Sequence, residues 1–168
     1  RVIVRGIVQG VGFRPFVYAA AVRYGIRGTV INHGSEVEIT ACGDRFDEFC
    51  REVSDGPKMS VIDSVTIEPL TEGAVMQTEF SILPSANGAR TGFIPADIAT
   101  CDACLADILN PQSRYYGYWA TSCTDCGPRY SIIRAFPYDR ERTSMEVFPP
   151  CDDCMTDYRN PKNRRHHA

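Results

Sequence analysis

The chain has 168 residues, enough for one ordinary domain or two small ones, and its hydrophobic content of 43% is sufficient for a globular core. Its net charge of −3 argues against a general binder of nucleic acid or of membrane surfaces. No apolar stretch approaches membrane-spanning length. Six of the eight cysteines stand in Cys-x2-Cys pairs, a spacing more typical of metal knuckles in a reducing compartment than of secreted disulfide scaffolds, so we expect a cytoplasmic protein.

Residues 1–85 carry the hydrophobic periodicities of a small α+β domain. Taken in chain order, the predicted elements are a strand at 2–8, a helix at 13–24, strands at 28–31 and 37–41, a helix at 46–53, and strands at 61–67 and 80–82. This order, with one strand added, predicts a ferredoxin-like split βαβ fold. In that fold one antiparallel sheet carries both helices on one face, which buries the core.

The stretch between the first strand and the first helix has the composition of a phosphate cradle. Two glycines permit a tight turn, and the backbone N–H groups of a strand-to-helix turn can converge on an anion. Arg14 adds a planar, permanently charged fork beside these donors, and Pro15 suits the first turn of a helix. The predicted phosphate-binding residues are Gln9, Gly10, Val11, Gly12, Phe13 and Arg14.

Asn32, at the end of a predicted strand, supplies the second part of this site. In a split βαβ sheet the first two strands are parallel with the third between them, so the cradle and Asn32 open onto one edge, about 10 Å apart. Arg14 and the loop amides would hold a phosphate while Asn32 orients a water for in-line attack. Such a site suits a substrate with a good leaving group, such as an acyl or carbamoyl phosphate. We therefore expect Arg14 and Asn32 to be catalytic.

The composition changes after residue 85. Residues 86–97 begin with small and polar side chains, as a linker does, and residues 98–168 are rich in Cys, Tyr, Asp and Pro. Cys101, Cys104, Cys123 and Cys126 form two Cys-x2-Cys pairs separated by 18 residues, a spacing that predicts a tetrahedral zinc site. Four thiolates leave no position for substrate, so we expect the zinc to be structural and to replace a hydrophobic core.

A shift of the sequence by 50 residues aligns the first cysteine pair with a third pair, Cys151 and Cys154. Seven of 18 positions in this alignment are identical, including both cysteines, which indicates a duplicated finger. The region 98–168 is thus predicted to be a tandem zinc-finger region in which all six paired cysteines are metal ligands. The equivalents of Cys123 and Cys126 fall beyond residue 168, so we expect the second finger to be truncated.

Two other ligand arrangements stay open. His166 or His167 can complete the second site, although they align with Tyr116 and Gly117, which are not ligands. Alternatively, the first and third cysteine pairs can share one metal in a cross-braced arrangement. Two sequential fingers need fewer assumptions.

The first half resembles the acylphosphatase family through Val8-Gln9-Gly10-Val11-Gly12-Phe13-Arg14 and through Gly28-Thr29-Val30-Ile31-Asn32. The resemblance implies an acylphosphatase fold, with an arginine that binds phosphate and an asparagine that positions the water. These roles fall on Arg14 and Asn32. The sequence departs from the family at His33-Gly34-Ser35-Glu36, where an acidic-Gly turn is usual, and this difference concerns loop shape and rate.

Cys-Gly-Pro-Arg at 126–129 and Pro-Tyr-Asp-Arg at 137–140 extend the resemblance to the whole chain, which is similar to the amino-terminal part of the HypF family of [NiFe]-hydrogenase maturation carbamoyltransferases. The resemblance implies that carbamoyl phosphate is hydrolysed at the acylphosphatase-type site. It further implies that the carbamate passes to a domain that uses ATP and Mg²⁺ to make carbamoyl adenylate, and that the carbamoyl group is transferred to a terminal cysteine of HypE. It places these later steps in domains outside this chain.

Two other functions stay open. The chain can be a free-standing acylphosphatase with a zinc module used for docking. It can also be a zinc-finger module that binds nucleic acid or protein, with an inert ferredoxin-like half. The predicted strands lack the Arg/Lys-Gly-Phe aromatic signature of ferredoxin-like RNA readers. We therefore expect neither a nucleic-acid nor a membrane partner.

Overall fold

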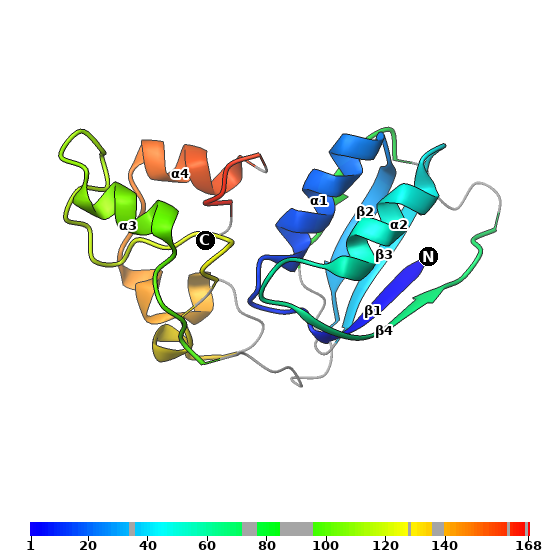
Figure 1. Ribbon diagram of the computed structural model, residues 1–168, viewed down its shortest axis with the longest axis horizontal. Coiled ribbons are helices and arrows are strands. Elements are labelled where there is room, and N and C mark those ends of the chain that lie inside the picture. Colours follow the sequence, from blue (N-terminus) through cyan, green and yellow to red (C-terminus); the bar gives the residue numbers. More distant parts are fainter. Residues whose placement is uncertain are drawn as a thin grey trace.

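The structure, a computed structural model, describes residues 1–33, 36–71, 77–84, 96–127, 129–135, 140–160, 162–166 and 168. Two halves lie side by side: a sheet covered by helices, formed by the first part of the chain, and a cysteine-rich half formed by the last part (Figure 1). Within the described ranges, no helix combines the length and the apolar character that crossing a membrane requires.

The first half is built on a five-stranded sheet in the order β4-β1-β3-β2-β5. Its elements are β1 (Val2–Ile7), α1 (Phe13–Tyr24), β2 (Arg27–Asn32), β3 (Glu36–Cys42), α2 (Phe46–Asp55), β4 (Val61–Ile67) and β5 (Phe80–Ile82). Strand β3 is antiparallel to both β1 and β2, and β5 is added parallel to β2. Helices α1 and α2 cover the same face of the sheet (Figure 1). The predicted ferredoxin-like, acylphosphatase-type α+β fold is confirmed.

The core lies between the sheet and the two helices, because alternate side chains of β2 and β3 are buried on one face. Val30 and Ile39 are fully buried there, and Val17 of α1 and Phe49 of α2 belong to the same cluster. Burying each such side chain contributes roughly 1.5–3 kcal/mol. Cys50 of α2 belongs to this core at 7% exposure, and burial raises the pKa of its thiol to about 11.

Burial along the edge strand β4 does not alternate as it does along β2 and β3. Val61 and Ile67 are 54% and 53% exposed, whereas Ile62 and Val65 pack against the core. An irregularity in the pairing of β1 with β4 places one extra residue on β4, because Arg5 pairs with Ser64 and the next residue pairs with Ile62. Ile62 and Val65, which are three positions apart, can therefore lie on the same face of the sheet.

The cysteine-rich half contains little regular structure among its described residues. It has the helices α3 (Asp102–Leu109) and α4 (Asp152–Arg159) and the 3-10 turns η1 (Tyr130–Ile132), η2 (Arg140–Arg142) and η3 (Ser144–Val147). Helices α3 and α4 each follow the first cysteine of a pair, as the duplication predicts. The buried cluster of this half consists of Cys104, Cys123 and Cys126, with Ile98 and Cys101 packed against it. Cysteines thus occupy the position of a hydrophobic core.

Some predicted features lie outside the described residues. They are the linker up to residue 95, the domain boundary at residue 85, Gly34 and Ser35 in the turn after Asn32, Pro128, the motif at 137–139, and His167. Of the predicted linker, the structure describes Ala96 and Asp97, and Asp97 accepts a hydrogen bond from the backbone N–H of Ser131 at 3.4 Å. The boundaries between domains stay predictions.

Candidate functional site

The loop between β1 and α1 has the form of an anion cradle. Val8 and Val11 are 1% exposed and anchor the loop in the core. Gly10 and Gly12 adopt positive φ angles of 67° and 72°, which turn the chain into α1. Gly12 caps α1 without a side-chain hydrogen bond, and an N-terminus of this kind offers backbone N–H groups to a bound anion.

Arg14 and Asn32 line one cavity of about 550 Å³, together with Gly10, Gly12 and Phe13. Asn32 is 4% exposed, and among the described residues its Oδ1 atom has no hydrogen-bond partner. A buried acceptor without a partner costs about 1–3 kcal/mol, which a bound water would offset. The structure thus brings together the two residues that we predict to be catalytic. Gln9 and Val11, also predicted for the cradle, are buried and do not line the cavity.

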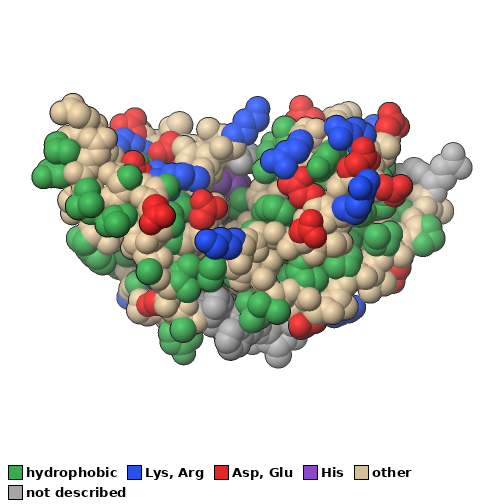
Figure 2. Space-filling model, in the orientation of Figure 1, with side chains coloured by type: hydrophobic (Ala, Val, Ile, Leu, Met, Phe, Trp, Pro, Cys, Tyr) green, Lys and Arg blue, Asp and Glu red, His purple; other side chains and the backbone are tan. Residues whose placement is uncertain are grey.

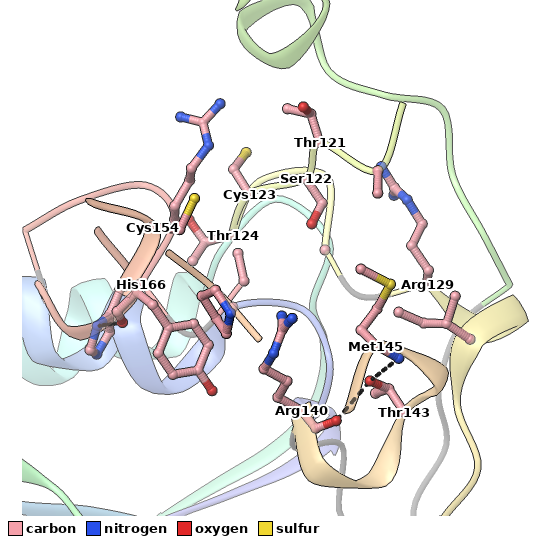
Figure 3. A pocket seen from close by; sticks show the side chains of 18 of the residues that line it. Thr121, Ser122, Cys123, Thr124, Arg129, Arg140, Thr143, Met145, Cys154 and His166 are labelled. Carbon is pink, nitrogen blue, oxygen red and sulfur yellow. Dashed lines mark hydrogen bonds between the residues drawn. The ribbon is translucent and has the colours of Figure 1, made fainter. Parts of the chain in front are cut away.

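The cysteine-rich half forms the opposite wall of this cavity. A Cβ atom placed on Gly127 would lie 3.1 Å from the carbonyl oxygen of Gly10, so the second cysteine knuckle touches the cradle. Figure 3 shows Arg140 extending from η2 toward the segment that carries Ser122 and Thr124. In the space-filling view a hollow lies where the two halves meet (Figure 2). The sequence patterns did not reveal this wall, because it joins segments more than 100 residues apart.

The charged side chains of the cavity are cationic. Arg14, Arg129, Arg140 and Arg165 line it together with His166, and none of its described lining residues is Asp or Glu. Elsewhere, acidic and basic side chains are mixed over the face drawn in Figure 2, in keeping with the net charge of −3. The cavity therefore attracts a small anion more strongly than the rest of the protein does.

Four cysteine thiols form a second site behind this wall. The Sγ atoms of Cys101, Cys104, Cys123 and Cys126 all lie within 4.8 Å of one another. Three of the separations are 3.6 Å (Cys101 to Cys123), 3.9 Å (Cys123 to Cys126) and 3.9 Å (Cys126 to Cys104). A Zn–S bond of about 2.3 Å in a tetrahedron requires sulfur atoms about 3.8 Å apart. The geometry of the four thiols thus fits zinc.

Cationic donors surround the four thiols. Arg164 donates to Cys104 Sγ at 2.9 Å. Arg129 donates to the carbonyl of Cys126 at 2.9 Å and approaches its Sγ at 3.7 Å. The hydrogen bond from Cys123, together with the charge of Arg129, lowers the pKa of the Cys126 thiol. The arginine contacts favour the thiolate, the form that binds metal, whereas burial raises the pKa of the Cys104 thiol.

The third cysteine pair is separate from this cluster. The thiols of Cys101 and Cys104 meet those of the second pair, as the sequential arrangement predicts, so the cross-braced alternative is wrong for them. Cys151 is exposed and Cys154 partly buried. His166, an alternative ligand for that pair, lies with its Nδ1 atom 2.9 Å from the carbonyl oxygen of Tyr158. Cys151 and Cys154 stay predicted ligands.

Comparison with known proteins divides the chain as the fold does. Residues 1–82 match the acylphosphatase family, and residues 100–133 match the HypF finger family. An acylphosphatase of Caldivirga maquilingensis is 46% identical over 86 residues, which cover 49% of this chain and 90% of that protein. By its fold, its cradle and this similarity, the chain belongs to the acylphosphatase family.

The whole chain also matches longer proteins. The carbamoyltransferase HypF of Rhodobacter capsulatus is 43% identical over 174 residues, covering 100% of this chain and 22% of that protein. A crystal structure of full-length HypF in a phosphate- and nucleotide-bound form matches with a TM-score of 0.88 at 38% identity, over 99% of this chain and 22% of the other. The chain is thus similar over its whole length to HypF carbamoyltransferases, and it spans 22% of the Rhodobacter protein and 19% of a second HypF, that of Synechocystis.

Proposed function

We propose that this chain hydrolyses carbamoyl phosphate at the site formed by Arg14 and Asn32. The observation that carries the proposal is the cationic cavity, which has an anion cradle on one side. Beside the cradle lies the buried Oδ1 atom of Asn32, which has no hydrogen-bond partner within the described part of the chain. This arrangement suits a small phosphate ester or anhydride and a single attacking water. Membership in the acylphosphatase family, together with the similarity to HypF carbamoyltransferases, supports a mixed anhydride of phosphate as the substrate class.

The reaction needs few protein groups. Backbone N–H groups of the cradle and the guanidinium of Arg14 hold the phosphate oxygens and stabilise their charge. Asn32 Oδ1 accepts a hydrogen bond from the water and directs its oxygen toward phosphorus. The new P–O bond forms as the bond to the carbamoyl oxygen breaks, and carbamate leaves with the bonding electron pair. The water's second proton passes to solvent, which leaves inorganic phosphate, so that catalysis rests on position and charge.

We extend the proposal to the longer proteins that this chain matches. In them the carbamate released here would feed an ATP- and Mg²⁺-dependent step that makes carbamoyl adenylate, followed by transfer to a HypE-type protein. The four-cysteine cluster would hold a structural zinc ion in support of this half. The six cysteines at 101, 104, 123, 126, 151 and 154 are proposed as ligands of the two fingers.

The test is phosphate release from carbamoyl phosphate and from acetyl phosphate, measured against an enzyme-free blank. Arg14→Ala should lower kcat/KM by 10²-fold or more, because it removes a charged donor to the phosphate. Asn32→Ala should lower kcat by about 10²–10³-fold with KM within a few-fold of wild type. Arg27→Ala is the matched control, since this exposed arginine stands at the opposite end of β2 from Asn32.

Hydrolysis that is unchanged in Arg14→Ala would refute the site. A loss of affinity in Asn32→Ala that equals its loss of turnover would refute the water-positioning role. Hydrolysis of acetyl phosphate at the same kcat/KM as carbamoyl phosphate would favour a general acylphosphatase, the second candidate, which the similarity of residues 1–82 to free-standing acylphosphatases supports.

A further inference from the structure

An arginine of the first cysteine repeat reaches into the second repeat. Arg114 approaches Cys154 Sγ at 3.6 Å and donates to the carbonyl oxygen of Asp153 at 3.2 Å. It also forms an ion pair with Asp157. All three partners belong to helix α4, 39 or more residues away along the chain.

The equivalent arginine of the second repeat makes the same three contacts in the opposite direction. Arg164 donates to Cys104 Sγ at 2.9 Å and to the carbonyl oxygen of Ala103 at 3.2 Å. It also forms an ion pair with Asp107. Every residue in this set stands 50 positions from its counterpart, so the two repeats contact each other reciprocally, as a pseudo-symmetric pair.

Further contacts hold Arg164 in place. Its carbonyl oxygen accepts hydrogen bonds from the backbone N–H of Thr124 at 2.8 Å and from the Thr124 hydroxyl at 3.1 Å. The next residue, Arg165, pairs with Asp107 and lies over the ring of Tyr115 at 3.8 Å. Arg164 therefore touches both knuckles of the four-cysteine cluster, through its side chain and through its backbone.

The chemistry of a four-thiolate site explains what these arginines can do. Zn²⁺ bound by four thiolates leaves a net charge of −2, which is costly in a partly buried site. A guanidinium that donates to a ligating sulfur offsets this charge and fixes the orientation of the ligand. Outer groups of this kind change metal affinity by about 10–100-fold.

We propose that the second cysteine repeat controls metal retention in the first, with Arg164 as a positioning residue for Cys104 and Arg114 as the return contact that holds the second repeat against it. These reciprocal contacts couple the two repeats. Any interaction that stabilises the folded second repeat, including metal bound at its own cysteines, therefore slows the loss of zinc from the first repeat. Arg164 itself does not bind the metal.

The experiment measures the rate at which the zinc-loaded chain transfers its metal to an excess of EDTA under native conditions. Arg164→Ala should accelerate transfer at least tenfold, and Arg164→Gln, which keeps donors without the charge, should give a smaller acceleration. Arg114→Ala should also accelerate transfer several-fold, although within the described ranges the contacts of Arg114 are to Tyr115 and to α4 and not to the four clustered cysteines. Arg159→Ala is the control, because Arg159 is an exposed arginine of α4 and the substitution removes the same charge.

Transfer rates within twofold of wild type in Arg164→Ala would overturn the proposal. So would acceleration in Arg164→Ala with no change in Arg114→Ala, since the coupling between repeats would then be absent. If Arg164→Ala unfolds the cysteine-rich half, Arg164→Gln becomes the deciding variant, and a wild-type rate there would count against the role of the charge. Metal transfer does not depend on hydrolysis, so these measurements test the coupling of the repeats independently of the proposed function.

Discussion

A Cβ atom placed on Gly12 would lie 2.8 Å from the carbonyl oxygen of Thr124 and 3.0 Å from its Cβ atom. Gly12 belongs to the anion cradle, and Thr124 stands between the second pair of clustered cysteines. The cradle and the cysteine knuckle are therefore in direct contact, with no room for a side chain between them. The cysteine-rich half thus supports one wall of the proposed phosphate site.

This contact predicts a specific effect of Gly12→Ala. The variant incurs left-handed backbone strain of about 1–2 kcal/mol, and its methyl group also collides with the Thr124 backbone. We expect phosphate, measured as a competitive inhibitor or by calorimetry, to bind at least tenfold more weakly. Gly25→Ala is the control, since Gly25 has a similar φ of 65° and no atom within 4 Å of the added Cβ.

Comparison of the two variants separates the effect of left-handed backbone strain from the effect of the steric clash with Thr124. Gly25→Ala should lower stability by the backbone strain alone and leave phosphate affinity within twofold of wild type. Equal losses of phosphate affinity in both variants would show that the contact with Thr124 does not shape the cradle.

Removal of the metal should affect the two halves differently. The hydrophobic core of the first half is made wholly of residues up to 82, whereas the buried cluster of the second half is made of cysteines. Without zinc, hydrogen exchange in α3 and α4 should rise by orders of magnitude, because nothing replaces the lost core. Exchange in β1, β2 and β3 should stay within a few-fold of the metal-bound chain.

The cradle itself is the sensitive reporter in this experiment. Its backbone N–H groups should exchange faster after chelation, and phosphate affinity should fall, since the wall at Thr124 and Gly127 is lost. Full loss of protection in the central strands would mean that the two halves fold as one unit, contrary to this expectation. The measurement is hydrogen exchange by mass spectrometry before and after EDTA treatment.

Local patterns were enough to predict much of this fold. The alternating residues of β2 and β3 and the spacing of Phe46, Phe49 and Val53 in α2 depend on nearest neighbours, so they identify the sheet and its helices. The cysteine spacing likewise predicts the four-thiol cluster, because each knuckle is a local structure. The strand at 61–67 was also predicted, but its period of two does not show which of Val61 and Ile62 faces the core, because an irregular pairing with β1 interrupts the alternation there.

Contacts between distant irregular segments could not be predicted in this way. Nothing in the sequence around Arg140 or Arg164 indicates which cavity or thiol these side chains face. The surroundings of Arg140 depend on how the two halves dock, and those of Arg164 depend on how the two cysteine repeats pack against each other. For the same reason the predicted phosphate site consisted of residues 9–14 and Asn32, all of them in the first half. The structure adds a second wall, supplied by residues that have no periodicity to mark them.

Arg140 offers a direct test of that second wall. It lines the cavity, where it donates to the carbonyl oxygen of Phe148, and it extends toward Ser122 and Thr124 (Figure 3). Its charge raises the local concentration of an anionic substrate without touching the attacking water. We therefore expect Arg140→Ala to raise KM for carbamoyl phosphate roughly 3–10-fold while kcat stays within twofold of wild type.

Salt and a second arginine make this prediction specific. The difference in KM between wild type and Arg140→Ala should shrink as ionic strength rises from about 0.02 to 0.5 M, because the Debye length falls well below the width of the cavity.

Arg134→Ala is the control: Arg134 pairs with Glu146 at 3.5 Å, its side chain is 55% exposed, and it does not line the cavity. If Arg134→Ala raises KM as much as Arg140→Ala does, the effect comes from net charge, and the cysteine-rich wall has no particular part in binding. If kcat falls instead while KM is unchanged, Arg140 stabilises the transition state. That result would contradict the assignment of catalysis to the first half alone.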